Sequence, residues 1–278
     1  MCGIVAYIGK KEAYPIVLKG LKRLEYRGYD SAGIALLHDG EINLYKRQGK
    51  VSNLEEYAAN FDLQGHAGIG HTRWATHGAP NDVNAHPHYS TSKDIVLIHN
   101  GIIENYDTLR KGLINNGYEF RSETDTEVLV HLIDDIRKNE NVTMAEAVRL
   151  ALLNVVGAYA IVVMSKDNPN QLVAARKSSP LVVGIGTDND FYLASDATPI
   201  VEYTKRVVYL EDEEIAIVDL NDGLKIVNIK NQEKTPYIQQ LELQLEALEK
   251  GGYEHFMLKE IHEQPRSIRD CFRGRLNA

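Results

Sequence analysis

The feature that most constrains the fold of this chain is a series of short apolar runs rich in β-branched residues, each long enough for one strand. These runs gather at both ends of the sequence, with helical segments between them. Few of them are separated by a helix-length crossover, so an α+β layered domain is favoured over a doubly wound parallel sheet. The predicted strands are Ile4–Ile8, Ile34–Leu37, Ile42–Tyr45, Ile95–Ile98, Tyr159–Met164, Leu172–Ala175, Leu181–Ile185, Phe191–Leu193, Val207–Leu210, Glu214–Val218 and Leu224–Ile229.

Helical periodicity is confined to fewer segments. Ala13–Leu24 places Val17, Leu21 and Leu24 on one face, with charged residues on the other. The same spacing of three or four residues predicts three more helices, which are Tyr106–Ile114, Thr126–Arg137 and Met144–Leu153.

The pattern changes after Ile229. Asn231–Pro236 is polar and ends with a proline, and Ile238–Leu248 then reads as an isolated amphipathic helix. We therefore predict a first domain over residues 1–230. Residues 231–278 are expected to be a linker helix followed by the truncated start of a second domain, because so short a remainder cannot build its own core.

Composition limits the possible partners. The chain of 278 residues carries a net charge of −8 and has no long basic run, which argues against nucleic acid or an anionic membrane as the main partner. Its longest apolar stretch is too short and interrupted to cross a bilayer. Two cysteines are no disulfide framework and suit a reducing compartment, so we expect a cytoplasmic protein.

Cys2 directly follows the initiator methionine. Removal of Met1 would give this residue a free α-amine beside its thiol. An unperturbed thiol titrates near ~8.5 and an α-amine near ~7.7–8, so one residue would carry both a nucleophile and a base suited to neutral pH. The alternative is that Cys2 is a small apolar residue at the start of a buried strand. Its position alone does not decide between the two.

Polar residues and glycines concentrate in four places, each next to an apolar strand or helix. Groups at the ends of rigid elements can face a cleft, so these segments are candidates for ligand-binding loops. The four segments are Glu25–Gly33, His71–Gly78, His99–Gly101 and Ser122–Glu127.

These segments, together with Cys2-Gly3-Ile4-Val5 and Asn84-Ala85-His86-Pro87-His88, resemble the glutaminase domain of class II glutamine amidotransferases, which are N-terminal nucleophile hydrolases. The likeness covers nearly the whole chain. It implies a four-layer α/β/β/α sandwich in which two mainly antiparallel sheets lie between helices, and it implies no cofactor.

Residues 253–265 resemble the start of the sugar-isomerase half found in one branch of this family. That branch makes glucosamine 6-phosphate from fructose 6-phosphate and glutamine. The phosphosugar-binding loops of the isomerase half have no counterpart in the chain. The resemblance therefore implies that L-glutamine binds here, that fructose 6-phosphate binds only through a missing isomerase domain, and that the full-length protein is a homodimer.

The resemblance also implies catalytic roles. Cys2 would attack the side-chain amide of glutamine to form a glutamyl thioester, with its own α-amine moving the proton. Asn100 and Gly101 would supply the donors of an oxyanion hole. The alternative for an Asn-Gly pair is a tight hairpin turn, because both residues tolerate a positive φ.

Glutamine binding is assigned in the same way. Arg73 would hold the α-carboxylate and Asp125 the α-ammonium, with Thr76 and His77 lining the same pocket. The alternatives are solvated surface charges for both and a helix cap for Asp125. Trp74 would gate the passage of ammonia, and its alternative is core packing.

Three residues receive a supporting role by resemblance, namely Arg27, Gly28 and His86. The histidines at 71, 77, 86, 88 and 99 raise the question of a metal, but they lack a zinc-like spacing with a carboxylate or cysteine cluster. We therefore expect hydrogen-bonded histidines and no metal.

Two other readings stay open. Another class II amidotransferase, such as the enzyme that aminates phosphoribosyl pyrophosphate, shares the chemistry. A non-catalytic glutamine-sensing module would keep Arg73 and Asp125 but could dispense with Cys2 and Asn100.

Overall fold

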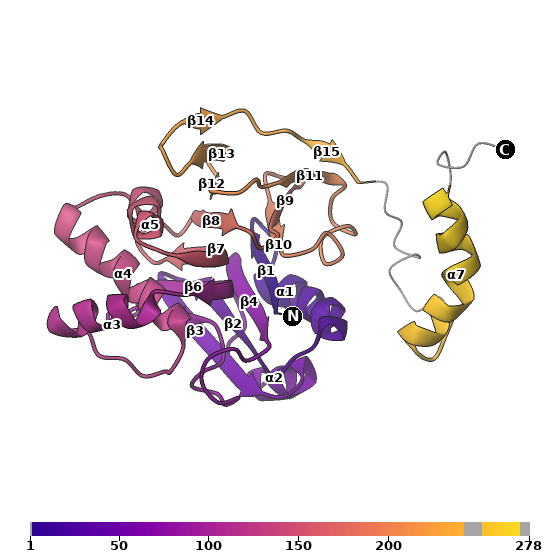
Figure 1. The fold of residues 1–278 in the computed structure, drawn as a ribbon, viewed down its shortest axis with the longest axis horizontal. Coiled ribbons are helices and arrows are strands. Elements are labelled where there is room, and N and C mark those ends of the chain that lie inside the picture. The colour runs from indigo at the N-terminus through magenta and orange to yellow at the C-terminus, as the bar shows by residue number, and fades with distance from the viewer. Residues whose placement is uncertain (1, 242–251, 273–278) are drawn as a thin grey trace. The chain divides into compact units, whose positions relative to one another are not determined.

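A computed structural model describes residues 2–241 and 252–272 of the chain (Figure 1). One compact unit ends at Gln240, and a second begins at Leu241. The first unit holds two β-sheets, and every pair of neighbouring strands in them is antiparallel.

The first sheet has eight strands and contains the N-terminal strand near its middle. In spatial order its strands are β15 (Gln239–Gln240), β11 (Arg206–Tyr209), β9 (Val182–Ile185), β10 (Phe191–Ala194), β1 (Gly3–Ile8), β4 (Ala67–Arg73), β2 (Ser31–His38) and β3 (Glu41–Gln48).

The second sheet has seven strands. In spatial order they are β14 (Glu233–Lys234), β13 (Gly223–Asn228), β12 (Glu214–Asp219), β8 (Gln171–Lys177), β7 (Gly157–Ser165), β6 (Ile95–Ile103) and β5 (His88–Tyr89).

Helices cover the outer face of each sheet, as the ribbon shows (Figure 1). The first sheet is covered by α1 (Ala13–Leu24), which leads into a short 3₁₀ helix (Glu25–Arg27), and by α2 (Val51–Ala58). The second sheet is covered by α4 (Asp125–Glu140) and α5 (Met144–Leu153), while α3 (Tyr106–Asn115) packs on α4. The arrangement is the expected four-layer α/β/β/α sandwich.

Two apolar cores hold these layers together. The core between the sheets contains Ile4, Ala6 and Ile8 of β1 together with side chains of β6, β7 and β12. The core between the second sheet and its helices contains Leu129 of α4 and Ile161 of β7. Strand β1 is buried along its whole length because one face meets the other sheet and the other meets α1. This explains why it reads as a continuous apolar run.

Glycines let α1 lie close to the first sheet. A Cβ atom on Gly20 of α1 would come within 2.7 Å of Val5, and one on Gly70 of β4 would come within 2.4 Å of Val17. The glycine-rich sequence of β4 was not predicted as a strand, because glycine is depleted in strands. Here the absence of side chains on these glycines allows α1 to pack close against the strand.

The structure confirms the four helices predicted between residues 13 and 153 and extends several predicted strands, but α2 and the short β5 were not predicted. The backbone N–H of Val51, at the start of α2, donates to Glu25 Oε1 over 2.6 Å. That partner lies far away in the sequence, so local helix signals could not show it.

The segment after residue 230 differs from its prediction where it is described. Strands β14 and β15 join residues 233–240 to the two sheets, so the first compact unit continues to Gln240. The helix predicted over Ile238–Leu248 is wrong at its start, because Gln239–Gln240 is a strand that pairs with β11. The remainder of that predicted helix, from residue 242, lies outside the described residues.

The second unit contains α7 (Phe256–Phe272), which has Pro265 inside it. No helix among the described residues is long and apolar enough to cross a membrane.

Candidate active site

A recess in the first unit brings together segments from both sheets and from α4. Cys2 lies directly before β1, Arg73 ends β4, Gly101 lies in β6 and Asp125 begins α4. The recess is lined by Cys2, Arg73, Trp74, Thr76, His77, His86, His99, Gly101, Thr124, Asp125 and Thr126.

The thiol of Cys2 faces this recess. The backbone N–H of Trp74 donates to Cys2 Sγ over 3.2 Å, and the side-chain Nδ2 of Asn100 donates to the backbone carbonyl of Cys2 over 3.3 Å. Burial raises the pKa of the thiol, against the opposing effect of the Trp74 hydrogen bond. The group is therefore protonated at neutral pH and needs a base before it can act as a nucleophile.

Asn100 and Gly101 lie inside β6, where Gly101 is opposite Tyr159 of β7. The hairpin-turn alternative is therefore wrong. Gly101 has φ +131°, and a Cβ atom on it would lie 2.0 Å from the carbonyl oxygen of Ala158. Only glycine fits a backbone of this shape so close to the neighbouring strand.

Arg73 is buried, with 3% of its surface exposed. Its guanidinium donates to the carbonyl oxygens of His77, Gly78 and Ala79 and lies 3.8 Å from Asp30. A solvated surface charge is therefore the wrong description. The arginine organises the loop that follows its own strand, and it places a cation at the wall of the recess.

Asp125 is also buried, and its Oδ2 accepts a 2.8 Å hydrogen bond from the backbone N–H of Ile103. It does not cap the helix, because Thr124 performs that function by accepting from the N–H of Glu127. Both alternatives considered for Asp125 are therefore wrong. The carboxylate links the start of α4 to the end of β6.

The loop after Arg73 carries the three remaining residues predicted to contact glutamine. Trp74 is 55% exposed, so the core-packing alternative is wrong. Its ring covers Gly28, where a Cβ atom would come within 2.7 Å of the indole. His77 Nδ1 lies 3.3 Å from the hydroxyl of Thr76, and the imidazole contacts the ring of Tyr106 edge to face.

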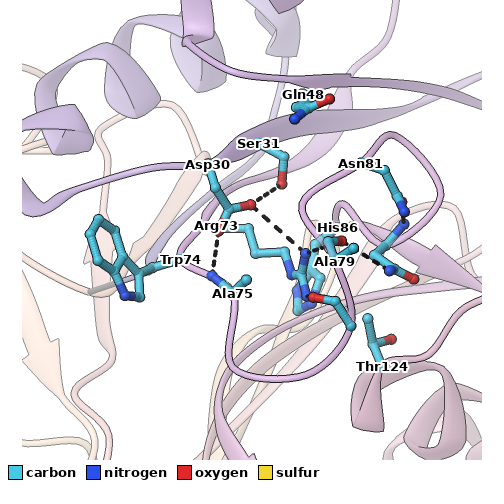
Figure 2. Close-up of polar contacts among 12 residues, drawn as sticks. Asp30, Ser31, Gln48, Arg73, Trp74, Ala75, Ala79, Asn81, His86 and Thr124 are labelled. Atoms are coloured by element: carbon cyan, nitrogen blue, oxygen red, sulfur yellow. Dashed lines mark hydrogen bonds and ion pairs between the residues drawn. The ribbon is translucent and has the colours of Figure 1, made fainter.

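Asp30 is a residue of this site that the sequence reasoning missed. Its carboxylate accepts hydrogen bonds from the hydroxyl of Ser31 and the backbone N–H of Ala75, and it approaches Arg73 (Figure 2). Figure 2 also shows Trp74 pointing away from the guanidinium of Arg73. Asp30 therefore contacts both Arg73, the last residue of β4, and Ala75, at the start of the loop that follows. The only signal was its place in the polar segment Glu25–Gly33.

The supporting residues fall into two groups. His86 lines the recess, whereas Arg27 and Gly28 do not. Arg27 donates to the hydroxyl of Ser195 over 3.4 Å, and the same hydroxyl accepts from the backbone N–H of Ile4 in β1. Arg27 thus contacts the residue that anchors the strand following Cys2.

Four of the histidines are buried beside the recess, namely His71, His86, His88 and His99. Burial lowers the pKa of each, to about 3 for His71. All four are therefore neutral at physiological pH. Over residues 2–241 and 252–272, no group of three or more His, Cys, Asp or Glu side chains is arranged to hold a metal ion.

The fold and its recess define a class of protein, the N-terminal nucleophile type of glutamine amidotransferase. A structural match of TM-score 0.70 and 29% identity covers 82% of the chain and 49% of the glutamine phosphoribosylpyrophosphate amidotransferase from B. subtilis. A glutamine aminotransferase class-II domain protein from Silicibacter pomeroyi, 15% identical, matches in fold with a TM-score of 0.55, over 82% of this chain and 99% of that one.

Sequence comparison gives the family. Residues 57–243 match the profile described as a glutamine amidotransferase domain. The chain belongs to this family, in its class II.

Two curated relatives carry the name glutamine--fructose-6-phosphate aminotransferase [isomerizing]. The one from Bacteroides thetaiotaomicron is 61% identical over 278 residues, which are 100% of this chain. The one from Chlorobaculum tepidum is 56% identical over 280 aligned residues and 99% of the chain. The chain spans 45% of the length of each of these relatives.

Proposed function

We propose that this chain hydrolyses L-glutamine to glutamate and ammonia through a thioester on Cys2. The observation that carries the proposal is that Cys2, Arg73, Gly101 and Asp125, from four separate segments, line one recess. A buried cation and a buried anion beside a thiol match the three parts of glutamine, which are its α-carboxylate, its α-ammonium and its reacting amide.

Cys2 acts as the nucleophile in this proposal. Because burial raises the pKa of its thiol, a base must take the proton as sulfur attacks the amide carbon. The α-amine that removal of Met1 would expose is that base, and it passes the proton to the departing ammonia. Water then attacks the thioester carbonyl, which releases glutamate and returns the proton to sulfur.

Asn100 and Gly101 stabilise the negative oxygen of each tetrahedral intermediate. The Asn100 amide already reaches the backbone of Cys2, which supports a place beside the reacting carbon. An amide nitrogen has two N–H donors, so one remains for the oxyanion. Removing such a donor typically lowers the rate by about 10²–10³.

Arg73 binds the α-carboxylate and Asp125 binds the α-ammonium, while Thr76 and His77 line the same recess and help to hold glutamine. The guanidinium has five N–H donors, so it can serve a carboxylate in addition to the three loop carbonyls. The exposed indole of Trp74 controls the exit of ammonia.

The whole protein, on this proposal, transfers the ammonia to fructose 6-phosphate and forms glucosamine 6-phosphate. The name of the relatives supports this, as does the share of their length that lies outside the chain. The first compact unit, which ends at Gln240, contains the glutaminase domain predicted over residues 1–230. The residues after it lead into the isomerase domain, which binds the sugar phosphate and forms the homodimer. The two cysteines are free thiols, which suits a cytoplasmic location.

The test is glutamate release by the whole chain, with removal of Met1 verified by intact mass. We expect Cys2→Ala to abolish the reaction. The control is Cys271→Ala, which removes the second free thiol, an exposed one, and should leave the reaction intact. Parental turnover by Cys2→Ala would refute the mechanism. Tight glutamine binding without release of glutamate by the parent would favour the sensing module instead.

The acceptor is tested on the full-length protein. Supplied with glutamine and either fructose 6-phosphate or phosphoribosyl pyrophosphate, it is expected to aminate only the sugar phosphate. Amination of phosphoribosyl pyrophosphate would reassign the chain to the branch of the B. subtilis enzyme, to which it is only 29% identical.

A further inference from the structure

We propose that His71 is a positioning residue that fixes which end of the Asn100 side-chain amide faces Cys2. The inference rests on the proposed function, since it concerns the oxyanion donor of that reaction. It does not follow from the sequence, where His71 was only one of several histidines.

The contact joins the two sheets. His71 lies in β4 of the first sheet and Asn100 in β6 of the second, and His71 Nε2 is 2.8 Å from Asn100 Oδ1. The histidine is fully buried and the asparagine is 8% exposed. Water therefore has little access to replace this hydrogen bond.

The chemistry of the contact determines its direction. The oxygen of a side-chain amide can only accept, so Nε2 of His71 must carry the proton and donate it. Because burial lowers the pKa of His71 to about 3, the ring stays neutral at physiological pH, with a single proton to place. The hydrogen bond to Asn100 places it on Nε2.

Orientation matters because the two ends of an amide have nearly the same shape. Packing alone barely distinguishes the observed Asn100 from one turned by 180°. As observed, Nδ2 donates to the carbonyl of Cys2. Turned over, the amide would present an oxygen to that carbonyl and to the developing oxyanion, and both contacts would be repulsive. The donor of His71 penalises the turned form, because Nδ2 would then meet the N–H of Nε2. Moving that proton to Nδ1 would not help, since Nδ1 is buried and has no hydrogen-bond partner among the described residues.

The ring of His71 is itself held in place. It stacks on His86 with ring centroids 4.2 Å apart and an interplanar angle of 21°. His86 Nδ1 accepts from the backbone N–H of His99, and its Nε2 donates to the hydroxyl of Thr126. These contacts connect the His71 ring to the start of α4, beside Asp125.

The experiment compares three variants of the whole chain lacking Met1. His71→Leu removes the donor, and His71→Gln restores an N–H group near the position of Nε2. His66→Leu is the matched control, because His66 lies just before the same strand and bonds the carbonyl of Pro169 over 2.9 Å, away from the recess.

We expect His71→Leu to lower kcat for glutamine hydrolysis by at least about 10-fold. The loss should be smaller than the roughly 10²–10³-fold loss that removal of an oxyanion donor typically causes. KM should change little, since the residue acts on the transition state. His71→Gln should recover most of kcat, and His66→Leu should keep it. If His71→Leu does not fold, His71→Phe keeps a ring against His86 and lacks the donor.

The decisive measurement is a double-mutant cycle with Asn100→Ala. If His71 acts through Asn100, the His71→Leu change should lower kcat no further once Asn100 is alanine. A defect that adds in full to that of Asn100→Ala would overturn the proposal, as would parental kcat in both donor-free variants. Glutamate release by Cys2→Ala would refute the proposed function instead, so the two failures are distinguishable.

Discussion

Replacing Glu127 by glutamine should destabilise the first unit in a way that depends on pH. This carboxylate is buried in α4 and accepts from the backbone N–H groups of Arg121 and Ser122 and from the Ser122 hydroxyl, over 2.6–3.1 Å. These contacts hold the segment that leads into Asp125. Loss of these contacts should therefore both destabilise the fold and loosen the segment that places Asp125 in the recess.

The magnitude follows from the pKa. Burial alone would raise the pKa of Glu127, but the nearby His131 and the N–H and O–H donors outweigh it and lower the pKa from 4.5 to about 2. At 1.36 kcal/mol per pKa unit, the ionised carboxylate contributes roughly 3 kcal/mol of stability at neutral pH. We expect Glu127→Gln to lose about 2–3 kcal/mol, because glutamine keeps the shape and one acceptor oxygen but not the charge.

The sign of the pH dependence is fixed by the direction of the pKa change. A depressed carboxyl pKa stabilises the folded state above the unfolded pKa of about 4.5, and that stabilisation is lost as pH falls towards 2. The difference between parent and variant should therefore shrink below about pH 5, to less than half its neutral value near pH 3.

Urea unfolding followed by circular dichroism at pH 7 and pH 3 measures both quantities. Glu140→Gln, at the exposed end of the same helix, is the control and should stay within about 0.5 kcal/mol of the parent. An unchanged unfolding free energy for Glu127→Gln at pH 7, or a difference that does not shrink at pH 3, would refute the reasoning.

Two further predictions concern the loop after β4. Gly28→Ala places a Cβ atom 2.7 Å from the indole at a backbone φ of +102°, so it should displace Trp74 and shift its fluorescence, which no other tryptophan obscures; an unchanged spectrum would contradict this contact. Asp30→Asn weakens the hydrogen bond that Asp30 accepts from the N–H of Ala75 and removes the negative charge next to Arg73. KM for glutamine should therefore rise by about 10-fold, which corresponds to the free energy of about one charged hydrogen bond. Steady-state kinetics test it, and an unchanged KM would show that the loop is held by other contacts.

The sequence predicted the secondary structure well wherever the local pattern was strong. Helices α1 and α5 have the predicted bounds, Ala13–Leu24 and Met144–Leu153. The glycine-rich β4 was missed because its small residues serve contact with α1, a reason that exists only in the folded protein. The start of α2 was missed because its first N–H is capped by Glu25 from another element.

The candidate site could be predicted only in part. The polar segments around His71 and His99 were read as loops, yet residues 71–73 and 99–101 lie inside strands. Their polar side chains have specific partners in the folded protein: His71 bonds Asn100 across the two sheets, and Arg73 bonds the carbonyls of the loop that follows it. No spacing in the sequence reveals that Arg73 and Asp125 share a recess. Their grouping came from family resemblance, and Asp30, whose role depends on distant partners, was missed.

The position of β1 also has a consequence for how the protein is made. This strand pairs on one side with β4 and on the other with β10, whose residues 191–194 lie almost two hundred residues along the chain. During synthesis β1 leaves the ribosome long before β10, which is made only after most of the first unit. Pairings so distant in sequence form slowly. A nascent chain therefore carries the Cys2 thiol beside a strand that lacks one of its two neighbours until residues 191–194 have been made.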